Sequence, residues 1–241
     1  MLELDEAAVE SWICPTNASP QPYQQEIIKD ALMSNGLIIL PADIDRLLIM
    51  SVVLYNFGRY FPGQKCVMLA PSSEAAEATK SGFNSIVGNE SASTVLLAQQ
   101  TPTERGQLWS SRTCKYYFTI PQTFNNDILN RNCSLDSISA VILNPLEKLQ
   151  QILITRDLIR TIRESAGCHR VLAFCDVNTY LIGSATDACK LLQSQHVSCY
   201  SMHSGPFAVL LEKLKIITVN VSDDHRAIID RFEQSTIKPI V

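Results

Sequence analysis

The chain has 241 residues, of which 46% are hydrophobic and 18% are charged, and its net charge at pH 7 is −4. This globular composition suits one large α/β domain or two small ones, and the low net charge excludes a global electrostatic attraction for nucleic acid. The acidic N-terminal sequence predicts no secretory signal, and no apolar run approaches the roughly 18 residues of a bilayer-spanning helix. The eight cysteines are scattered without a C-x-x-C pair, so we expect a reduced, soluble, intracellular protein.

Short apolar segments alternate with amphipathic segments along most of the chain. Residues 1–21 are polar and contain several prolines, which predicts a flexible N-terminal lead-in. The apolar segments, predicted as strands, are 37–40, 65–71, 94–98, 116–121, 140–144, 170–175 and, after a less regular stretch, 215–221. The segments predicted as helices are 23–32, the stretch after the loop at 41–45, 73–86, 103–109, 122–129, 147–164, 185–193 and 223–234.

Continuous apolar strands that alternate with helices are typical of a parallel sheet covered on both faces. We therefore predict that residues 22–241 form a single α/β domain, with a mostly parallel sheet of about six to seven strands. Within it, the stretch from Leu37 to Pro62 has the layout of a phosphate-binding loop: a buried strand, a tight loop and a long amphipathic helix.

Further sequence features extend this pattern from residue 22 to about residue 180. They are Tyr23-Gln24, Leu40-Pro41, the run Val52–Phe57, Arg59, Phe61-Pro62, Ala70-Pro71, Trp109, Pro121-Gln122, Asn126-Asp127 and the run Arg170–Ala173. In these features the chain resembles the first RecA-like domain of superfamily 2 helicases, in particular the branch of the Fanconi anaemia group M translocase and archaeal Hef. The resemblance implies a RecA-like fold.

The phosphate-binding loop of that family reads Pro-Thr-Gly-x-Gly-Lys-Thr, and this chain departs from it. Asp43 and Asp45 stand where glycines let backbone N–H groups approach the phosphates, so each adds a Cβ and a negative charge. Arg46 takes the position of the lysine, and Leu47 takes that of the hydroxyl that holds Mg²⁺. The resemblance therefore implies a loop without ordinary ATP binding. We expect Arg46 to form an ion pair with Asp43 or Asp45.

Two further catalytic motifs are also replaced. The family's Asp-Glu-Ala-His motif corresponds to Leu143, Asn144, Pro145 and Leu146, which offer neither the Mg²⁺-binding aspartate nor the glutamate that orients water. Its Ser-Ala-Thr motif aligns with residues 175–177, and we interpret the literal Ser-Ala-Thr at 184–186 as a helix cap. Three losses on a retained scaffold imply a pseudo-helicase domain with no cofactor, rather than an ATPase.

In active relatives, the loops after the Ala-Pro strand and the Pro-Gln strand contact the nucleic-acid backbone. The candidate contacts in this chain are Ser72, Ser73, Arg112, Lys115, Gln122 and Thr123, with Arg105 and Arg131 as further members of a basic edge. Glu74 follows Ser73, where the family has a lysine nearby, and this weakens the attraction for phosphate. A solvated charged face is the alternative interpretation of these side chains.

Three functional hypotheses follow. The first is a protein-interaction scaffold in a nuclear DNA-repair, meiotic or genome-silencing complex, which binds another protein through the face that a second RecA-like domain covers in helicases. Arg46, Pro145 and Leu146 are expected near that interlobe face. The second is an ATP-independent binder of branched or single-stranded nucleic acid. The third is a divergent enzyme with Asp43, Asp45 and Asp176 as metal ligands.

Other kinds of site have little support in the sequence. The four histidines lack the spacing of a zinc site, and no G-x-S-x-G nucleophile elbow of a hydrolase occurs. We therefore expect no bound metal and no membrane partner.

Overall fold

The computed structural model describes residues 4–14, 20–40, 45–88, 93–165, 170–176, 196–205 and 208–217, the last two ranges as backbone alone. The strands are β1 (Gly36–Leu40), β2 (Lys65–Leu69), β3 (Thr94–Leu96), β4 (Tyr116–Thr119), β5 (Ile138–Leu143), β6 (Arg170–Asp176), β7 (His196–Gly205) and β8 (Ala208–Ile217). The helices are α1 (Glu6–Val9), α2 (Pro22–Met33), α3 (Arg46–Tyr60), α4 (Ser73–Val87), α5 (Pro102–Ser110), α6 (Pro121–Leu129), α7 (Leu146–Leu149) and α8 (Leu153–Glu164), with a short 3₁₀ helix at Leu135–Ser137.

The described strands form one eight-stranded sheet in the order β3-β4-β2-β5-β6-β1-β7-β8. The neighbours from β3 to β7 pair in parallel, whereas β7 and β8 pair antiparallel. The predicted α/β architecture with a mostly parallel sheet is therefore confirmed.

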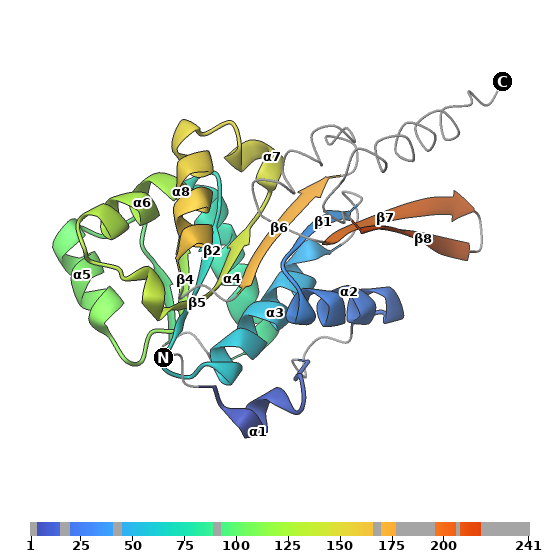
Figure 1. The fold of residues 1–241 in the computed structure, drawn as a ribbon, viewed down its shortest axis with the longest axis horizontal. Helices are drawn as coiled ribbons and strands as arrows, with labels where there is room; N and C mark the ends of the chain where they lie inside the picture. The colour runs from blue at the N-terminus through green and yellow to red at the C-terminus, as the bar shows by residue number, and fades with distance from the viewer. Residues whose placement is uncertain are drawn as a thin grey trace.

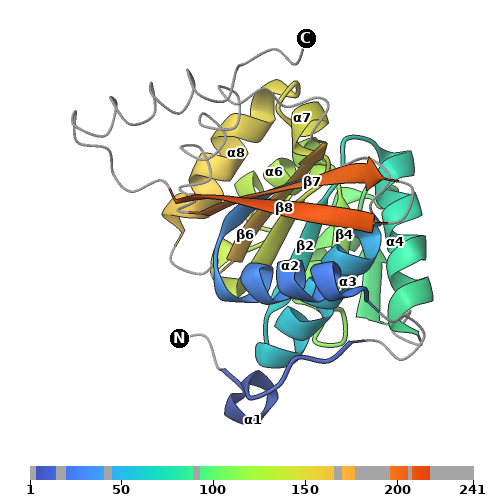
Figure 2. The same cartoon turned by 90° about the vertical axis from the view of Figure 1, so that its right-hand side faces the viewer.

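Helices cover both faces of this sheet (Figures 1 and 2). Helices α2, α3 and α4 pack on one face, and α5 to α8 pack on the other. Successive strand residues point to opposite faces, so Ile38 and Leu40 of β1 join the first core cluster, while Leu37 and Ile39 join the second. This explains why the strand reads as a continuous apolar run.

The helix predicted at 147–164 is wrong as a single element, because the chain breaks between α7 and α8. Leu149 and Leu158 would lie about 180° apart on a continuous helix with about 3.6 residues per turn. Both are nevertheless fully buried in the same core cluster. The break lets each part turn its apolar side chains toward the sheet.

The C-terminal part of the described sheet is a hairpin rather than the single predicted strand at 215–221. Strand β7 continues the parallel sheet beside β1, and β8 returns along it over ten paired positions. The helices predicted at 185–193 and 223–234 lie outside the described residues.

Part of the predicted flexible lead-in is attached to α3 (Figure 1). The buried side chain of Asn56 accepts a hydrogen bond from Ile13 N and donates one to Ile13 O, both at 2.8 Å. The backbone N–H of Asp5 donates to Tyr60 O at 2.9 Å. This part of the segment is therefore held against the domain rather than loose. No helix in the described ranges has the length and apolar character needed to cross a bilayer.

Candidate functional site at the carboxyl edge of the sheet

The carboxyl ends of the parallel strands meet at one edge of the sheet, which is the edge where α/β proteins bind ligands. Strand β1 ends there at Leu40, β5 at Leu143 and β6 at Asp176. Because β1 lies beside β6 and β6 beside β5, the carboxyl ends of these three strands are neighbours. Arg46, at the start of α3, and the segment Leu143–Leu146, which the resemblance aligns with the second motif, therefore lie at the same edge.

Arg46 reaches across this edge to the end of β6. Its Nη2 donates to Asp176 Oδ2 at 3.2 Å and lies 3.4 Å from Leu40 O. The two charged side chains are 15% and 16% exposed, so the ion pair is largely shielded from solvent. The predicted pair between Arg46 and Asp45 does not form. Asp43 lies outside the described residues.

Asp45 has a different role, as the N-cap of α3. Its Oδ1 accepts from Leu48 N at 3.2 Å, which satisfies one of the free N–H groups at the start of the helix. The carboxylate also complements the positive end of the helix dipole. Gln24 donates to the carbonyl of Asp45 at 3.5 Å, which ties the loop to α2.

Leu47, at the position of the Mg²⁺-binding hydroxyl, packs against the first core cluster. Its side chain occupies the space beside Gly82 of α4, where an added Cβ would overlap it. An apolar contact therefore occupies the position that the resemblance assigns to a metal ligand.

In the segment Leu143–Leu146, which the resemblance aligns with the second motif, two of the four residues belong to the core. Leu143 and Leu146 are fully buried, and Asn144 N donates to Leu69 O at 3.1 Å. Leu146 therefore offers no exposed apolar surface to a partner. Pro145, which forms a cis peptide bond with Asn144, is half-buried.

Glu147 lies beside the Arg46–Asp176 pair. Burial raises the pKa of its carboxyl above the ordinary value, although the charge of Arg46 and backbone N–H groups act in the opposite direction. Within the described part of the chain, its Oε2 is buried and has no hydrogen-bond partner. The site thus holds one guanidinium cation and two carboxyl groups, so it carries no net positive charge that would attract a phosphate.

The candidate nucleic-acid contacts fall into two groups at opposite edges of the sheet. Ser72 and Gln122 follow β2 and β4 and lie at the carboxyl edge with their neighbours Ser73 and Thr123. Ser72 Oγ accepts from Ala75 N at 3.2 Å as the N-cap of α4, and Gln122 donates to Asn126 at 3.1 Å. Arg112 and Lys115 precede β4 and lie at the amino edge.

Arg105 does not belong to a basic edge, because it is buried in an ion pair. Its Nε lies 2.8 and 3.0 Å from the two carboxylate oxygens of Asp127, which is fully buried. Trp109 Nε1 donates to the same carboxylate at 2.9 Å. Sequence reasoning missed this cluster. The available signal was the i, i+3 spacing of Phe124 and Asp127, which places the carboxylate on the buried face of α6.

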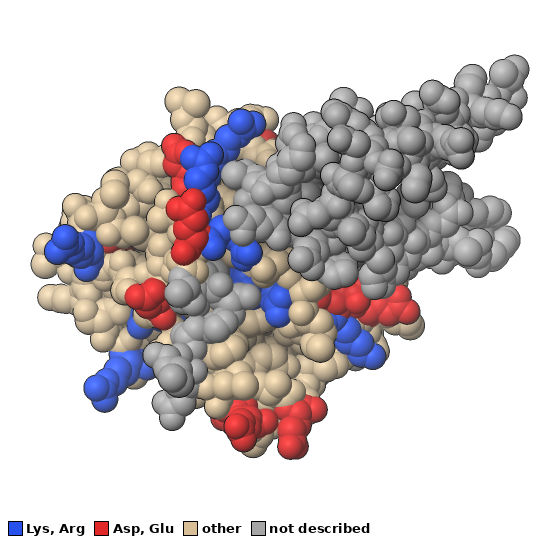
Figure 3. Space-filling view, viewed as in Figure 1, with Lys and Arg blue, Asp and Glu red and all other residues tan. Residues whose placement is uncertain are grey.

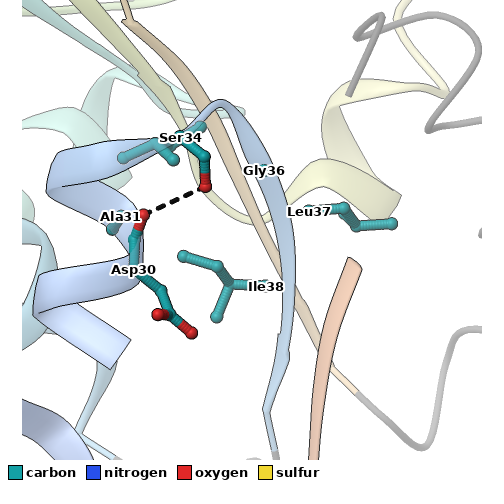
Figure 4. A pocket seen from close by; sticks show the side chains of 7 residues that line it. Asp30, Ala31, Ser34, Gly36, Leu37 and Ile38 are labelled. Atoms are coloured by element: carbon teal, nitrogen blue, oxygen red, sulfur yellow. Dashed lines mark hydrogen bonds between the residues drawn. The ribbon is translucent and has the colours of Figure 1, made fainter. Parts of the chain in front are cut away.

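The ligands proposed for a divergent metal enzyme do not assemble in the described part of the chain. Asp45 caps α3 and Asp176 pairs with Arg46, and among the described residues no three His, Cys, Asp or Glu side chains form a metal-binding group. A small hollow between α2 and β1, beside Asp30, Ser34 and Ile38 (Figure 4), holds about 10 Å³. That is room for about one water molecule, not for a substrate.

Comparison with known proteins finds that the chain is similar to helicases. No family model matches the chain. It is 26% identical to the ATP-dependent DNA helicase fml1 of Schizosaccharomyces pombe, over 99% of this chain and 29% of the relative. It is 34% identical to the DEAD-box ATP-dependent RNA helicase FANCM of Arabidopsis thaliana, over 60% of this chain and 11% of the relative. The Pyrococcus furiosus Hef helicase domain has the same fold, with a TM-score of 0.65 at 20% identity, over 82% of this chain and 39% of that chain.

The chain is similar to helicases of the Fanconi anaemia group M branch, and its fold is that of the RecA-like Hef helicase domain. The chain spans less than a third of the length of the two curated relatives. The resemblance inferred from residues such as Asn56 and Phe57 is confirmed. Asn56 holds the N-terminal segment, and Phe57 stacks on Phe61 with ring centroids 6.0 Å apart, so these residues of the helicase-like sequence serve the packing of α3.

Proposed function

We propose that this domain does not hydrolyse ATP and that it acts as a protein-interaction scaffold in a nuclear DNA-repair, meiotic or genome-silencing complex. The observation that carries the proposal is the ion pair of Arg46 with Asp176. Arg46 stands where the family has its phosphate-binding lysine, and its guanidinium is directed to an acidic partner at the same edge.

Phosphate binding at this edge would require several simultaneous changes. Arg46 would have to leave a largely shielded carboxylate, and breaking such a pair leaves an uncompensated charge behind. Leu47 offers no oxygen for Mg²⁺, and Asn144 and Pro145 offer no carboxylate. Each deficit acts on a different step of phosphoryl transfer, so restoring one residue alone would not recover activity.

The proposed partner surface at the carboxyl edge is polar. With Leu146 buried, the described side chains available there include Ser73, Gln122 and Thr123, of which Gln122 is exposed. Uncharged hydrogen-bonding groups of this kind suit a protein partner with a polar interface core or rim. The nucleic-acid alternative has less support, because Arg112 and Lys115 lie at the opposite edge from these loops.

The nucleotide part of the proposal is tested by thermal unfolding with and without Mg-ATP. We expect no change in Tm and no phosphate release, with or without DNA. A ligand at a hundredfold excess over its Kd would add about 2.7 kcal/mol to the free energy of unfolding. For a domain of this size that corresponds to a rise in Tm of about 5–10 °C. A saturable rise of that kind would contradict the proposal.

The scaffold part is tested by affinity capture with variants of the carboxyl edge. The double substitution Ser73→Arg and Gln122→Arg places two charges on the proposed surface without touching the core. We expect this variant to lose one defined protein whose capture by the unsubstituted chain persists after nuclease treatment. Arg156→Gln, at an exposed position of α8, should leave that capture unchanged. Capture that disappears on nuclease treatment would instead support the nucleic-acid alternative.

A further inference from the structure

A second hollow, of about 320 Å³, lies at the amino edge of the sheet, opposite the degenerate nucleotide site. Its walls are the turn before β2, which includes Gly63 and Lys65, and the connection from α5 to β4, which includes Ser111 and Lys115. Its volume is at the lower end of the range for small-ligand pockets, about 300–1,000 Å³. The hollow is therefore large enough for one compact group.

Three cationic side chains line this hollow: Lys65, Arg112 and Lys115. No Asp or Glu is among its lining residues. In the ranges that carry described side chains, none of the three cations has an ion-pair or hydrogen-bond partner for its charged group. Three like charges around one concave space repel each other, and an anion placed between them removes that repulsion.

Lys65 is the least usual of the three, because it is half-buried. Burial lowers the pKa of its ammonium group below the ordinary value. A cation that loses hydration without gaining a partner is destabilising. An anionic ligand would supply the missing partner, so this position indicates a binding site rather than a solvated face.

The walls of the hollow are fixed by backbone hydrogen bonds. Cys66 N donates to Lys115 O at 2.8 Å, and Lys115 N donates to Ser93 O at 2.9 Å. Within the connection from α5 to β4, the side-chain Oγ of Ser111 accepts from Thr113 N at 3.2 Å. The cations therefore stand on a preformed frame, which reduces the entropy cost of binding.

We propose that the amino-edge pocket, defined by Lys65, Arg112 and Lys115, binds a phosphorylated side chain of a partner protein. A guanidinium donates two parallel hydrogen bonds to a phosphate, and lysines add compact charges around it. The proposal names a partner class for the interaction role above and rests on that role. The pocket and Arg46 lie at opposite edges, so the Mg-ATP test and the pocket test can fail independently.

A phosphoprotein segment fits these observations better than a nucleic acid does. Binders of single strands combine a basic groove with exposed aromatic rings on which bases stack. Of the aromatic residues adjacent in sequence to the lining residues, Trp109 and Tyr116 are buried, as is the next residue, Tyr117. Phe61 is half-buried and stacks on Phe57. On the face of the molecule in Figure 3, positive and negative side chains are interspersed, for example along α8, rather than gathered in one long basic stripe. A single hollow that contains a half-buried lysine suits one phosphate group.

The test measures binding of the full chain to three fluorescent probes. They are a short Gly-Ser peptide with one central phosphoserine, the same peptide without phosphate, and a mixed-sequence single-stranded oligonucleotide. The variants are Lys65→Met and Arg112→Gln, with Arg156→Gln as a control that removes the same charge elsewhere on the exposed surface. Because Arg112 is exposed, its variant tests the pocket without disturbing the fold; thermal unfolding verifies that the Lys65 variant is folded.

We expect the phosphopeptide alone to bind, inorganic phosphate to compete with it, and each pocket variant to weaken binding about tenfold, as loss of one charge-assisted hydrogen bond predicts. Arg156→Gln should leave the affinity unchanged. Absence of phosphopeptide binding would overturn the proposal, and so would equal loss in the Arg156 control. Tighter binding of the oligonucleotide, lost in the same pocket variants, would also overturn it and assign the pocket to nucleic acid.

Discussion

Asp127 is a fully buried carboxylate whose charge and hydrogen-bonding capacity are met by two neighbours. Arg105 and Trp109, both on α5, donate hydrogen bonds to this carboxylate, and the three side chains form one buried cluster. Removing one member of such a pair leaves a buried charge without compensation, which costs more than an ordinary hydrogen bond. The cluster thereby fastens α5 to α6.

We expect Asp127→Ala to lower the free energy of unfolding by about 3–5 kcal/mol, because it leaves the Arg105 guanidinium buried and unpaired. The matched control is Asp157→Ala. Asp157 forms a surface ion pair with Arg160, in which the Arg160 side chain is 65% exposed and the Asp157 side chain is 77% exposed. Such surface pairs contribute about 0–1 kcal/mol. Urea denaturation measures both values. Equal losses in the two variants would contradict the role given to the buried cluster.

Glu147 gives the site a pH dependence with a definite sign. Burial raises the pKa of the folded-state carboxyl above that of the unfolded chain. The protonated form is therefore favoured in the folded protein. Its contribution to stability is present at pH values below the unfolded pKa, and is lost as pH rises through the folded pKa.

We expect Glu147→Gln to be more stable than the unsubstituted protein at pH 7, and the difference to shrink as pH falls into the acidic range. Thermal unfolding across that range measures the difference in Tm. Glu164→Gln at the exposed end of α8 is the control and should show no such convergence. A lower Tm for Glu147→Gln at pH 7 would show that its charge interaction with Arg46 outweighs burial.

At the scale of elements, α3 is the helix on which the fold depends most directly. Its residues pack on β2 and β5 and support both α2 and α4. It packs closely against the sheet at Gly58, where an added Cβ would overlap the Tyr116 hydroxyl and lie 2.7 Å from ring atoms Cε1 and Cζ. Tyr116 is 2% exposed and also donates to Tyr55 O at 3.3 Å, so its ring has little freedom to move.

We expect Gly58→Ala to be destabilising by about 1–3 kcal/mol, the usual cost of overpacking a core. Alanine gains about 0.5–1 kcal/mol over glycine in a helix, but the overlap with Tyr116 outweighs this gain. Gly63→Ala is the control, because an added Cβ there meets nothing within 4 Å. Urea denaturation of both variants measures the difference. A stabilised Gly58→Ala protein would show that α3 can move away from β4.

At the scale of the whole molecule, the N-terminal segment belongs to the domain. Asn56 makes two hydrogen bonds to the backbone of Ile13, and Trp12 and Cys14 pack against the core cluster of α2, α3 and α4. The core itself is built from residues beyond this segment, so the remaining chain retains its own source of stability.

We expect deletion of residues 1–14 to leave a folded domain with a lower free energy of unfolding, by about 2 kcal/mol. This estimate counts the two hydrogen bonds between Asn56 and Ile13 at about 1 kcal/mol each, before the other hydrogen bonds and the apolar contacts of the segment are added. For a domain of this size, Tm should fall by about 4–8 °C. Thermal unfolding followed by circular dichroism tests this. An unchanged Tm would show that the segment is a loose lead-in.

Much of the fold follows from the sequence, because local patterns carry it. Apolar runs of strand length and the helical spacing of residues such as Ile27 and Ala31 predict most elements close to their observed bounds. The break between α7 and α8 was missed, although the positions of Leu149 and Leu158 are incompatible with one continuous helix. The residues at the positions that the resemblance assigns to the catalytic motifs are likewise read directly from the sequence, because a motif position is a local property.

The sequence by itself therefore determined the fold class, the helicase resemblance and the residue types at the positions that the resemblance assigns to the catalytic motifs. The tertiary structure decided which side chains meet. Arg46 pairs with a residue 130 positions away, because the strand order places β6 beside β1. The same packing buries Arg105 and separates Gln122 from Lys115 at opposite ends of β4. Such partnerships depend on sheet order and helix packing, which no local pattern specifies.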